Sequence, residues 1–509
     1  MKRNIYKVSC LAFLAITGVA CTDLEVEEVD SRVIETDGGE FGGVDAQATL
    51  DGAYADLRAY SDQANSYALH EISSDELLVP TRGTDWGDNG IWRILHQHTW
   101  DATHPYLLSS WNQYNSVVFK TNQIIDSRSS PTALQAAEAK YLRAFNMYMI
   151  LDLFGKVPFR NVDDGVEVDP DVLSASEAVA FIANDLAEAI PDLPSTGPGS
   201  ETIRASKASA HFLNAKLHLN KHIFTGSGSA DASDMDVVIS SVDAISGDGF
   251  ALADGYFDIF EPDTDTETIF YTDASVGNRI WAGLHYFQNS PDNAGGGWNG
   301  FSTTAEFYAL FEGDADSNEP GNNQEERRGY VPDDGANLGV GYGFLVGQQY
   351  DDTGAPLLDR AGRDLVFTKE FPGLTGNREN NGIRVIKYHP ENGAFAGHYI
   401  FFRYADAHLM KAEALFRKGN DGDALSLVNE LRGIRGASDL GSLSETDLLD
   451  ERGRELYIEG WRRNDQIRFG TFTSEWDLKG GTSEDFRTLF PIPANAVATN
   501  PNLEQNPGY

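Results

Sequence analysis

Two stretches of this 509-residue chain combine flat aromatic side chains with turn-prone polar residues. Aromatic rings can stack on the C–H faces of a sugar, while Asn, Asp and Arg side chains can hydrogen-bond its hydroxyl groups. A tryptophan that follows three glycines and precedes an asparagine, as in residues 295–299, is not expected in a core helix. We therefore predict ligand contacts from both stretches. The predicted residues are Arg82, Asp85, Trp86 and Asn89 in the first stretch, and Trp281, Tyr286, Asn289, Trp298 and Asn299 in the second.

Every one of these aromatic residues can alternatively pack in a hydrophobic core. For the three tryptophans of the two stretches, the core and ligand interpretations both stay open. For four other tryptophans, two of which lie near the first stretch, core packing is the favoured interpretation. These are Trp92, Trp100, Trp111 and Trp461.

Two acidic loops have the residue types that bind calcium. One contains Asp263 and Asp265, and the other contains Asp314 and Asp316. The second loop begins like an EF-hand, but Glu319 stands where the sharp turn needs glycine. Solvated acidic loops are therefore the favoured interpretation, with structural calcium as a weak alternative. No cofactor is predicted.

The sequence lacks three common catalytic or nucleotide-binding motifs. His-Glu-x-x-His, Gly-x-Ser-x-Gly and the phosphate-binding P-loop are all missing. A glycosidase needs two carboxylates at a set separation in space, but with 78 acidic residues their proximity in sequence is uninformative. We predict a protein that is not an enzyme.

The chain is strongly acidic, with 39 Lys and Arg against 78 Asp and Glu and a formal charge of −39. Removal of residues 1–20 would take away Lys2, Arg3 and Lys7 and make the charge −42. Such a surface repels nucleic acid and anionic lipids. It also favours neutral polymers over anionic ones as ligands, unless a local basic pocket exists.

The N-terminus has the pattern of an export signal. A basic start is followed by the apolar run Leu11–Ala20, which is too short to span a bilayer. Gly18-Val19-Ala20 before Cys21 resembles a bacterial lipoprotein signal, in which the cysteine is acylated. We predict a signal peptide at 1–20, a lipid anchor at Cys21 and a flexible tether at 21–40. The alternative is an ordinary signal peptide with Cys21 incidental.

Hydrophobic periodicity predicts a mainly α fold. Between about 247 and 397 the pattern becomes irregular and rich in Gly, Asn and aromatic residues, with short strands at 267–271 and 384–388. Small residues at helix contact positions suggest tetratricopeptide-like pairs. Helices are expected from about 47 and at 107–125, 133–154, 174–190, 206–223, 234–245, 402–418, 421–435 and 445–461.

Four segments together resemble the SusD/RagB family of outer-membrane lipoproteins of Bacteroidota. They are residues 139–158, 403–414, 451–465 and the terminus, where Leu489-Phe490-Pro491-Ile492-Pro493 is followed by 500–509. Because the matches run from the signal to the last residue, the resemblance covers the whole chain. Charged residues in these segments are expected to form a structural network that docks helices and an extended C-terminal strap. They are Arg143, Glu413, Glu455, Glu459, Arg462 and Asp465.

The resemblance implies a right-handed superhelical scaffold of tetratricopeptide-like helix pairs with a large irregular segment packed on it. One globular unit is expected, made of an N-terminal region at 41–246 and a C-terminal region at 247–509, with the ligand site mainly in 247–397. The family captures glycans at the cell surface without catalysis and covers a SusC-like TonB-dependent transporter in the outer membrane. Alternatives are the same fold binding peptides or other non-sugar nutrients, or serving mainly as a transporter lid.

Overall fold

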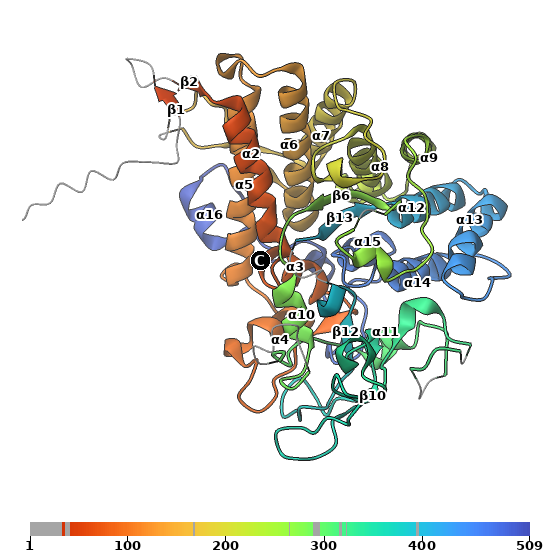
Figure 1. Cartoon of the computed structure of the whole chain (residues 1–509). Helices are drawn as coiled ribbons and strands as arrows, with labels where there is room; N and C mark the ends of the chain where they lie inside the picture. Colours follow the sequence, from red (N-terminus) through yellow and green to blue (C-terminus); the bar gives the residue numbers. More distant parts are fainter. Residues whose placement is uncertain are drawn as a thin grey trace, which may run out of the picture.

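The structure is a computed structural model of the chain. It describes residues 33–35, 41–165, 168–263, 265–288, 296–314, 318–321, 323–392 and 397–509. Within these residues helices dominate, and Figure 1 shows them in the upper and right-hand parts of the molecule above an irregular lower part. The mainly α fold class predicted from the sequence is confirmed.

Long helices of the N-terminal half that follow one another in the chain pack against each other. Helix α5 packs on α6, α6 on α7, and α8 on α9. This arrangement matches the helix pairs that the sequence predicted. The bounds are α5 Pro105–Ile125, α6 Ala133–Phe154, α7 Ala175–Ala189, α8 Lys207–Phe224 and α9 Ala232–Gly247.

Local capping residues explain where these helices begin and end. Thr132, Ser174 and Ser206 each start a helix with a reciprocal capping box, which satisfies backbone N–H groups that have no partner within the helix. Gly155 ends α6 in the left-handed conformation, with φ of 70°. The predicted bounds of these three helices are confirmed to within one residue.

The C-terminal helices continue the scaffold. Helix α12 (Tyr404–Arg417) packs on α13 (Asp421–Ile434), on α14 (Glu445–Leu456) and back on α9. The predicted start of α12 at residue 402 is wrong, because the residues before it form strand β13 (Tyr399–Arg403). This strand pairs antiparallel with β6 (Thr268–Thr272), which ties the helices to the irregular segment.

The predicted single helix at 445–461 is also wrong. Helix α14 ends at Leu456, and α15 (Arg462–Arg468) begins after a tight turn in which Ile458 adopts a φ of 54°. Two buried carboxylates hold this turn, since Glu76 accepts a hydrogen bond from the Ile458 N–H and Glu71 from the Gly460 N–H. Long-range contacts therefore override a helical pattern here.

The irregular segment is built from short antiparallel strand pairs and loops. Strand β9 lies between β8 and β12. These three strands form the largest sheet among the described residues. The predicted strands at 267–271 and 384–388 are confirmed as β6 and β12. The remaining elements are α2 Ala46–Asp56, α3 Asn65–Glu71, α4 Ile91–His96, α10 Gly277–Gly283, α11 Ala305–Tyr308, α16 Ala494–Thr499, β1 Val33–Glu35, β2 Phe41–Val44, β3 Leu77–Leu78, β4 Val157–Phe159, β5 Asp171–Leu173, β7 Ser302–Thr303, β8 Gly329–Tyr330, β9 Tyr342–Leu345, β10 Gly347–Gln348, β11 Val366–Phe367 and β12 Arg384–Ile386.

One hydrophobic core extends through both parts. Its buried residues run from Val44 to Leu503 and include Phe270 and Phe344 of the irregular segment. Strand β1 lies within the range 21–40 predicted as a tether, so three residues of that range belong to a hairpin with β2. The rest of that range, like Cys21 and the signal peptide, lies outside the described residues, and the predicted domain bounds stay predictions.

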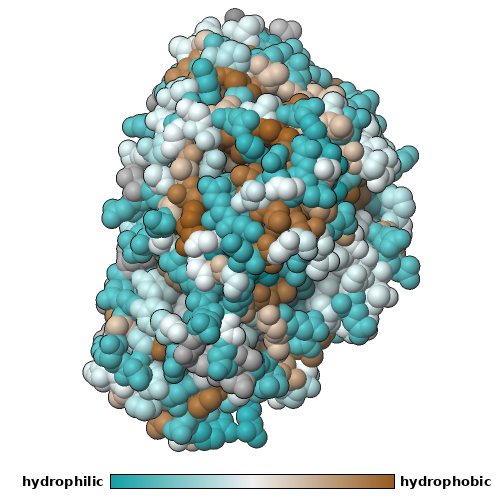
Figure 2. Space-filling view, turned by 90° about the vertical axis from the view of Figure 1, so that its right-hand side faces the viewer, coloured by the Kyte–Doolittle hydropathy of each residue, from teal (hydrophilic) through white to brown (hydrophobic). Residues whose placement is uncertain are grey.

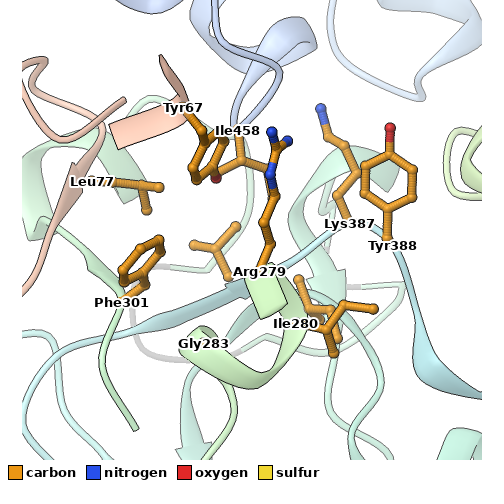
Figure 3. Close-up of a pocket in the computed structure, with 11 residues that line it drawn as sticks. Tyr67, Leu77, Arg279, Ile280, Gly283, Phe301, Lys387, Tyr388 and Ile458 are labelled. Atoms are coloured by element: carbon orange, nitrogen blue, oxygen red, sulfur yellow. The ribbon is translucent and has the colours of Figure 1, made fainter. Parts of the chain in front are cut away.

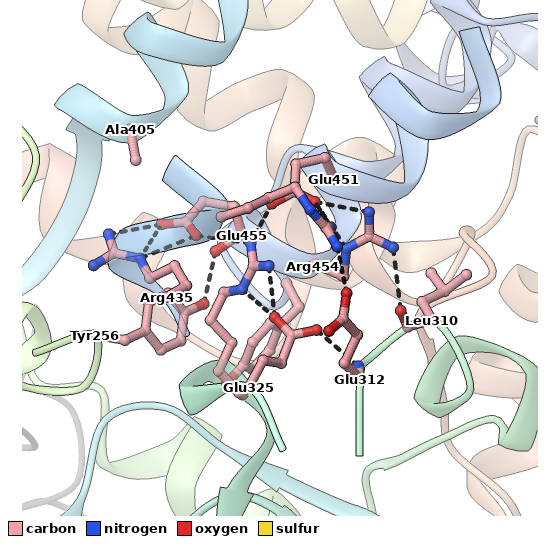
Figure 4. A network of polar contacts seen from close by, with 12 residues as sticks. Tyr256, Leu310, Glu312, Glu325, Ala405, Arg435, Glu451, Arg454 and Glu455 are labelled. Carbon is pink, nitrogen blue, oxygen red and sulfur yellow. Dashed lines mark hydrogen bonds and ion pairs between the residues drawn. The ribbon is translucent and has the colours of Figure 1, made fainter. Parts of the chain in front are cut away.

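A buried network of ion pairs joins α14 to the irregular segment (Figure 4). The Glu455 carboxylate accepts hydrogen bonds from Arg403 at 2.7 Å, Arg435 at 3.0 Å and Arg327 at 3.1 Å. Glu451 pairs with Arg327 at 2.8 Å and is likewise buried. Burial alone raises the pKa of Glu455, but the three guanidinium groups outweigh it and hold the pKa well below its usual range.

The charged residues expected to form a structural network do so, mostly through partners on other elements rather than at helical spacing. Each of these six charges is therefore matched by an opposite charge, which offsets the cost of burying it. The pairs are Arg143 with Asp185, Glu413 with Arg468, Glu455 with Arg403, Glu459 with Lys387, Arg462 with Asp75, and Asp465 with Arg452.

The C-terminal residues form the predicted strap over the helices, with the short helix α16 inside it. The Asn506 side chain donates to the carbonyl oxygens of Phe154 at 2.9 Å and Phe490 at 2.8 Å. The hydroxyl of Tyr509 accepts from Trp100 Nε1 at 2.8 Å and donates to the Leu489 carbonyl at 2.7 Å. These contacts fasten the end of the chain to α6 and to the loop before α5.

The face in Figure 2, which is the right-hand side of Figure 1, carries small hydrophobic patches between hydrophilic side chains. No described helix combines the length and apolar character needed to cross a membrane.

Candidate functional site

The structure brings the two predicted ligand stretches together, although about 200 residues separate them in the chain. The Trp86 indole N–H donates to the Trp298 carbonyl at 2.7 Å, and the Tyr286 hydroxyl donates to the Asp85 carboxylate. The first stretch lies in the loop between β3 and α4, and the second lies in the loop after α10. The sequence predicted two clusters, and the fold makes one site of them.

A third segment, which the sequence analysis missed, completes this site. The Arg360 guanidinium lies 3.8 Å from the centre of the Tyr286 ring and pairs with Asp85 at 2.9 Å and Glu379 at 2.5 Å. Glu379 also lies 3.1 Å from the His285 imidazole. The segment consists of turns within the irregular region, where single arginines and glutamates give no local signal.

Exposed hydrophobic side chains gather around this site. Four large hydrophobic side chains here are each more than a third exposed. Phe287 and Trp298 lie in the segment of Tyr286, and Leu358 and Val366 lie in the segment of Arg360. Elsewhere in the described chain, only Leu134 and Val168 are large hydrophobic side chains with comparable exposure. A concentration of exposed apolar surface marks a contact surface for a ligand or partner.

Trp86 and Trp298 differ in how much of their rings is available. Trp298 is 38% exposed, as its glycine-rich context predicted. The Trp86 ring is half-buried, because it packs edge-on against Trp92 and closely against the Gly300 backbone. Trp298 therefore offers the more open aromatic face. The Trp86 indole holds the Trp298 backbone through its hydrogen bond to the Trp298 carbonyl.

Two of the predicted ligand residues are buried and hold the loops instead. Arg82 is 2% exposed, and its guanidinium donates to the carbonyl oxygens of Asn299 at 2.8 Å and Gly300 at 2.7 Å. Asn299 is fully buried, and its side-chain oxygen accepts from Arg384 at 2.6 Å. These contacts fix the loop that carries Trp298 against the loop that carries Trp86.

The other predicted residues lie at the edges of the site. Asn89 is exposed in a left-handed turn with φ of 52°. Trp281 is half-buried in α10, and its carbonyl accepts the Trp298 N–H at 2.5 Å. Asn289 lies outside the described residues.

The ionisation of the site suits binding rather than proton transfer. Hydrogen bonds from Tyr286 and Arg360 lower the pKa of Asp85, and burial together with Asp85 raises the pKa of Tyr286 to about 12. Burial works to raise the pKa of Glu379, but hydrogen bonds from Arg360 and His285 lower it on balance. Burial lowers the pKa of His285 to about 4. At neutral pH both carboxylates are ionised, so neither is placed to act as the general acid of a glycosidase.

Two hollows elsewhere do not offer a comparable surface. The cavity in Figure 3, lined by Tyr67, Arg279 and Lys387, has a volume of about 30 Å³, which suits a water molecule rather than a sugar. A groove of about 780 Å³ lies between α5 and α16, but its tryptophan, Trp111, is only 5% exposed.

The described residues of the two acidic loops form no cation site. Asp265 uses its carboxylate to accept hydrogen bonds from the N–H of Thr268 at 2.6 Å and from the Thr268 hydroxyl at 2.6 Å. Asp263 and Asp314 are described, whereas Asp316 lies outside the described residues. Among the described residues, no three acidic, histidine or cysteine side chains are grouped as metal ligands.

Comparisons with known proteins agree on one family. A model described as the SusD family matches residues 375–509. The chain is 26% identical to the starch-binding protein SusD of Bacteroides thetaiotaomicron, over 100% of this chain and 99% of that protein. The solved structure of a SusD-like protein from Bacteroides fragilis has a TM-score of 0.70 at 21% identity, covering 91% of this chain and 96% of that one. The surface glycan-binding protein A from Bacteroides uniformis has a TM-score of 0.68 at 20% identity, covering 91% and 98%.

The chain is similar to SusD-family proteins over its whole length. The resemblance that the four sequence segments predicted is thereby confirmed. Three of the four segments lie within or at the edge of the matched range, which contains α12, α14, α15 and the C-terminal strap. Most of the candidate site comes from loops before residue 375, outside the matched range.

Proposed function

We propose that this protein binds glycans without cleaving them and delivers them to a SusC-like TonB-dependent transporter in the outer membrane. The observation that carries the proposal is the convergence of three distant segments on one exposed surface. This surface combines an open tryptophan and other exposed apolar side chains with ionised Asp85, Arg360 and Glu379.

The names of the relatives support this proposal. The matched protein of Bacteroides thetaiotaomicron is a starch-binding protein, and the structure from Bacteroides uniformis is a surface glycan-binding protein. Both names describe binding and neither describes catalysis. We extend the binding role, and not a particular glycan, to this chain.

Binding would combine stacking with hydrogen bonds. One sugar face on Trp298 removes roughly 50–100 Å² from water, which is worth about 1–2.5 kcal/mol. Two or three such contacts, reduced by the free-energy cost of association, give an affinity of roughly millimolar to micromolar. Asp85, Glu379 and the exposed Asn89 offer acceptors and donors for hydroxyl groups. Weak binding suits a protein that must release its ligand to a transporter.

A lipid anchor at Cys21 would hold the protein at the cell surface beside its transporter. Two or three acyl chains bind a membrane almost permanently, at about 0.8 kcal/mol per buried methylene. Mass spectrometry of the mature N-terminus tests this placement. An unmodified Cys21, or cleavage at another position, would contradict it, and co-purification with a TonB-dependent transporter would support the partner.

Affinity electrophoresis in gels that contain neutral or acidic polysaccharides tests glycan binding. We expect at least one polymer to retard the protein and Trp298→Ala to reduce the retardation. Leu134→Ala is the matched control, because Leu134 is equally exposed but lies on α6, away from the site. Retardation by no polymer, with protection against thermal unfolding by peptides instead, would favour the peptide-binding alternative. Release of new reducing ends from a bound glycan would contradict the non-enzymatic role.

A further inference from the structure

Arginines gather at the candidate site without matching carboxylates, although the chain has twice as many acidic as basic residues. Arg82, Arg93, Arg378 and Arg384 make no ion pair with a carboxylate of the described residues. In contrast, the buried arginines beneath α14 are all paired with glutamates. Because the chain has many carboxylates, a group of arginines without carboxylate partners suggests a role other than ion pairing within the protein.

Two of these arginines are fully buried, and only neutral oxygens surround their guanidinium groups. Arg82 donates to the Ser302 hydroxyl at 2.7 Å and the Asn381 carbonyl at 2.9 Å, besides its bonds to residues 299 and 300. Its Nε is buried without a partner. Arg384 donates to the Asn299 side chain, to the Asn381 carbonyl at 2.9 Å and to the Glu379 carbonyl at 2.6 Å.

Neutral oxygens satisfy hydrogen bonds, but they do not cancel a net charge. A positive charge in a low-dielectric interior therefore projects its field to the nearest surface. Burial lowers the pKa of Arg82 to about 9, and burial together with Arg82 lowers the pKa of Arg384 well below its ordinary value. With its pKa at about 9, Arg82 carries its proton at neutral pH.

The exposed part of the site is mixed in sign, because Arg360 pairs with Asp85 and Glu379, so the excess positive charge is that of the buried Arg82 and Arg384. Arg360 is 47% exposed, and Arg378 is exposed on the turn whose Asn377 N–H donates to the Thr81 carbonyl beside the Trp86 loop. Residues 81–93 and 357–384, which carry these groups, contain six arginines and one lysine against six carboxylates, so this region is close to neutral in a chain with a formal charge of −39.

We propose that the site selects anionic glycans, whose carboxylate or sulfate groups lie against Arg378 and Arg360 over the buried charges of Arg82 and Arg384. This inference rests on the proposed glycan-binding function and names the chemical class of its ligand. The net negative charge of the whole chain favours neutral polymers as ligands. The buried Arg82 and Arg384 supply the local positive charge that would reverse this preference at the site. The acidic remainder of the surface would then repel anionic polymers everywhere except at the site, which gives specificity.

Matched polymer pairs test the proposal. Polygalacturonate, alginate and chondroitin sulfate are compared in affinity electrophoresis with methyl-esterified pectin, carboxyl-reduced alginate and desulfated chondroitin, and with amylose, laminarin and mannan as neutral polymers. We expect an anionic polymer to be bound and its neutralised form to be bound at least tenfold more weakly. Raising the salt from 50 to 500 mM should weaken the binding, because salt screens exposed charges.

Arg378→Gln should weaken binding of the anionic polymer about two- to fivefold. Arg58→Gln is the control, because Arg58 is similarly exposed but lies away from the site and pairs with Asp273 at 2.9 Å. Both variants alter surface residues, so folding should be retained. Equal binding of an anionic polymer and its neutralised form, or binding of neutral polymers alone, would overturn this inference and leave the proposed function intact. Binding of no polymer would instead overturn the proposed function.

Discussion

The protein contains two groups of buried arginines that differ in their partners. Beneath α14, Arg327, Arg403 and Arg435 each meet glutamates that are themselves fully buried. At the candidate site, Arg82 and Arg384 meet carbonyl, hydroxyl and amide oxygens only. The difference separates two uses of a buried charge: the first group joins parts of the scaffold, and the second keeps a net charge next to an exposed surface.

Removing a carboxylate from the paired group should have the largest effect. Glu455→Gln leaves three guanidinium groups without their shared partner, and we expect a loss of about 3–5 kcal/mol in the free energy of unfolding. Urea denaturation followed by circular dichroism measures it. The control is Glu430→Gln, because Glu430 is 57% exposed and should change stability by less than about 0.5 kcal/mol. A small effect of Glu455→Gln would mean that the network is not needed for stability.

The second largest effect should be a loss of stability in acid, caused by protonation of the buried glutamates that pair with arginines. Burial raises the pKa values of Glu413 and Glu451, but Arg468 and Arg327 outweigh it and bring both to about 2 from an ordinary 4.5. The folded-state pKa is depressed, so the stabilisation is present above about pH 4.5 and is lost as the pH falls through about 2. Each group contributes on the order of 3 kcal/mol. Urea midpoints from pH 5.5 to 2.5 should fall, and less steeply in Glu413→Gln; a flat profile would contradict this.

The unpaired group should tolerate loss of a guanidinium better. Arg384→Met removes hydrogen bonds to neutral oxygens but leaves no opposite charge stranded. We expect a loss of about 1–3 kcal/mol in the free energy of unfolding. The same urea assay compares it with Glu455→Gln. An equal or larger loss would show that the neutral oxygens compensate this arginine as fully as carboxylates do, and would end the contrast between the two groups.

Ligand binding at the site should be insensitive to pH, which is the smallest expected effect. With the pKa of His285 at about 4, that of Tyr286 at about 12 and that of Arg82 at about 9, none of these residues changes protonation between pH 5.5 and 7.5. The dissociation constant from calorimetry should stay within about a factor of two over this range. A transition near pH 6.5 would indicate that His285 is protonated in the free protein.

The helical scaffold was predictable because its signals are local. Thr132 and Ser174 begin helices by hydrogen bonds within four residues, and Gly155 ends one through its own backbone conformation. The break after Leu456 was not predictable, because the carboxylates that hold the turn come from α3 and the following loop, nearly 400 residues earlier.

The candidate site could be predicted only in part for the same reason. Trp298 stood out because glycines precede it, and its exposure agrees with that signal. Arg360 reaches Asp85 from 275 residues away through the folding of an irregular segment, and no pattern near Arg360 marks it. Burial of Arg82 and Asn299 likewise depends on loops that meet only in three dimensions. Residue type indicated the chemistry, while the choice between supporting and ligand-facing roles required the fold.

Gly300 limits how this site can evolve. A Cβ atom at this position would lie 2.2 Å from the Trp86 indole, closer than Cβ atoms come to other heavy atoms in proteins. Every missense change of a glycine codon adds a Cβ atom, so no amino-acid replacement at 300 leaves the indole where it is. A replacement at position 300 therefore requires the Trp86 indole to move or to be replaced as well.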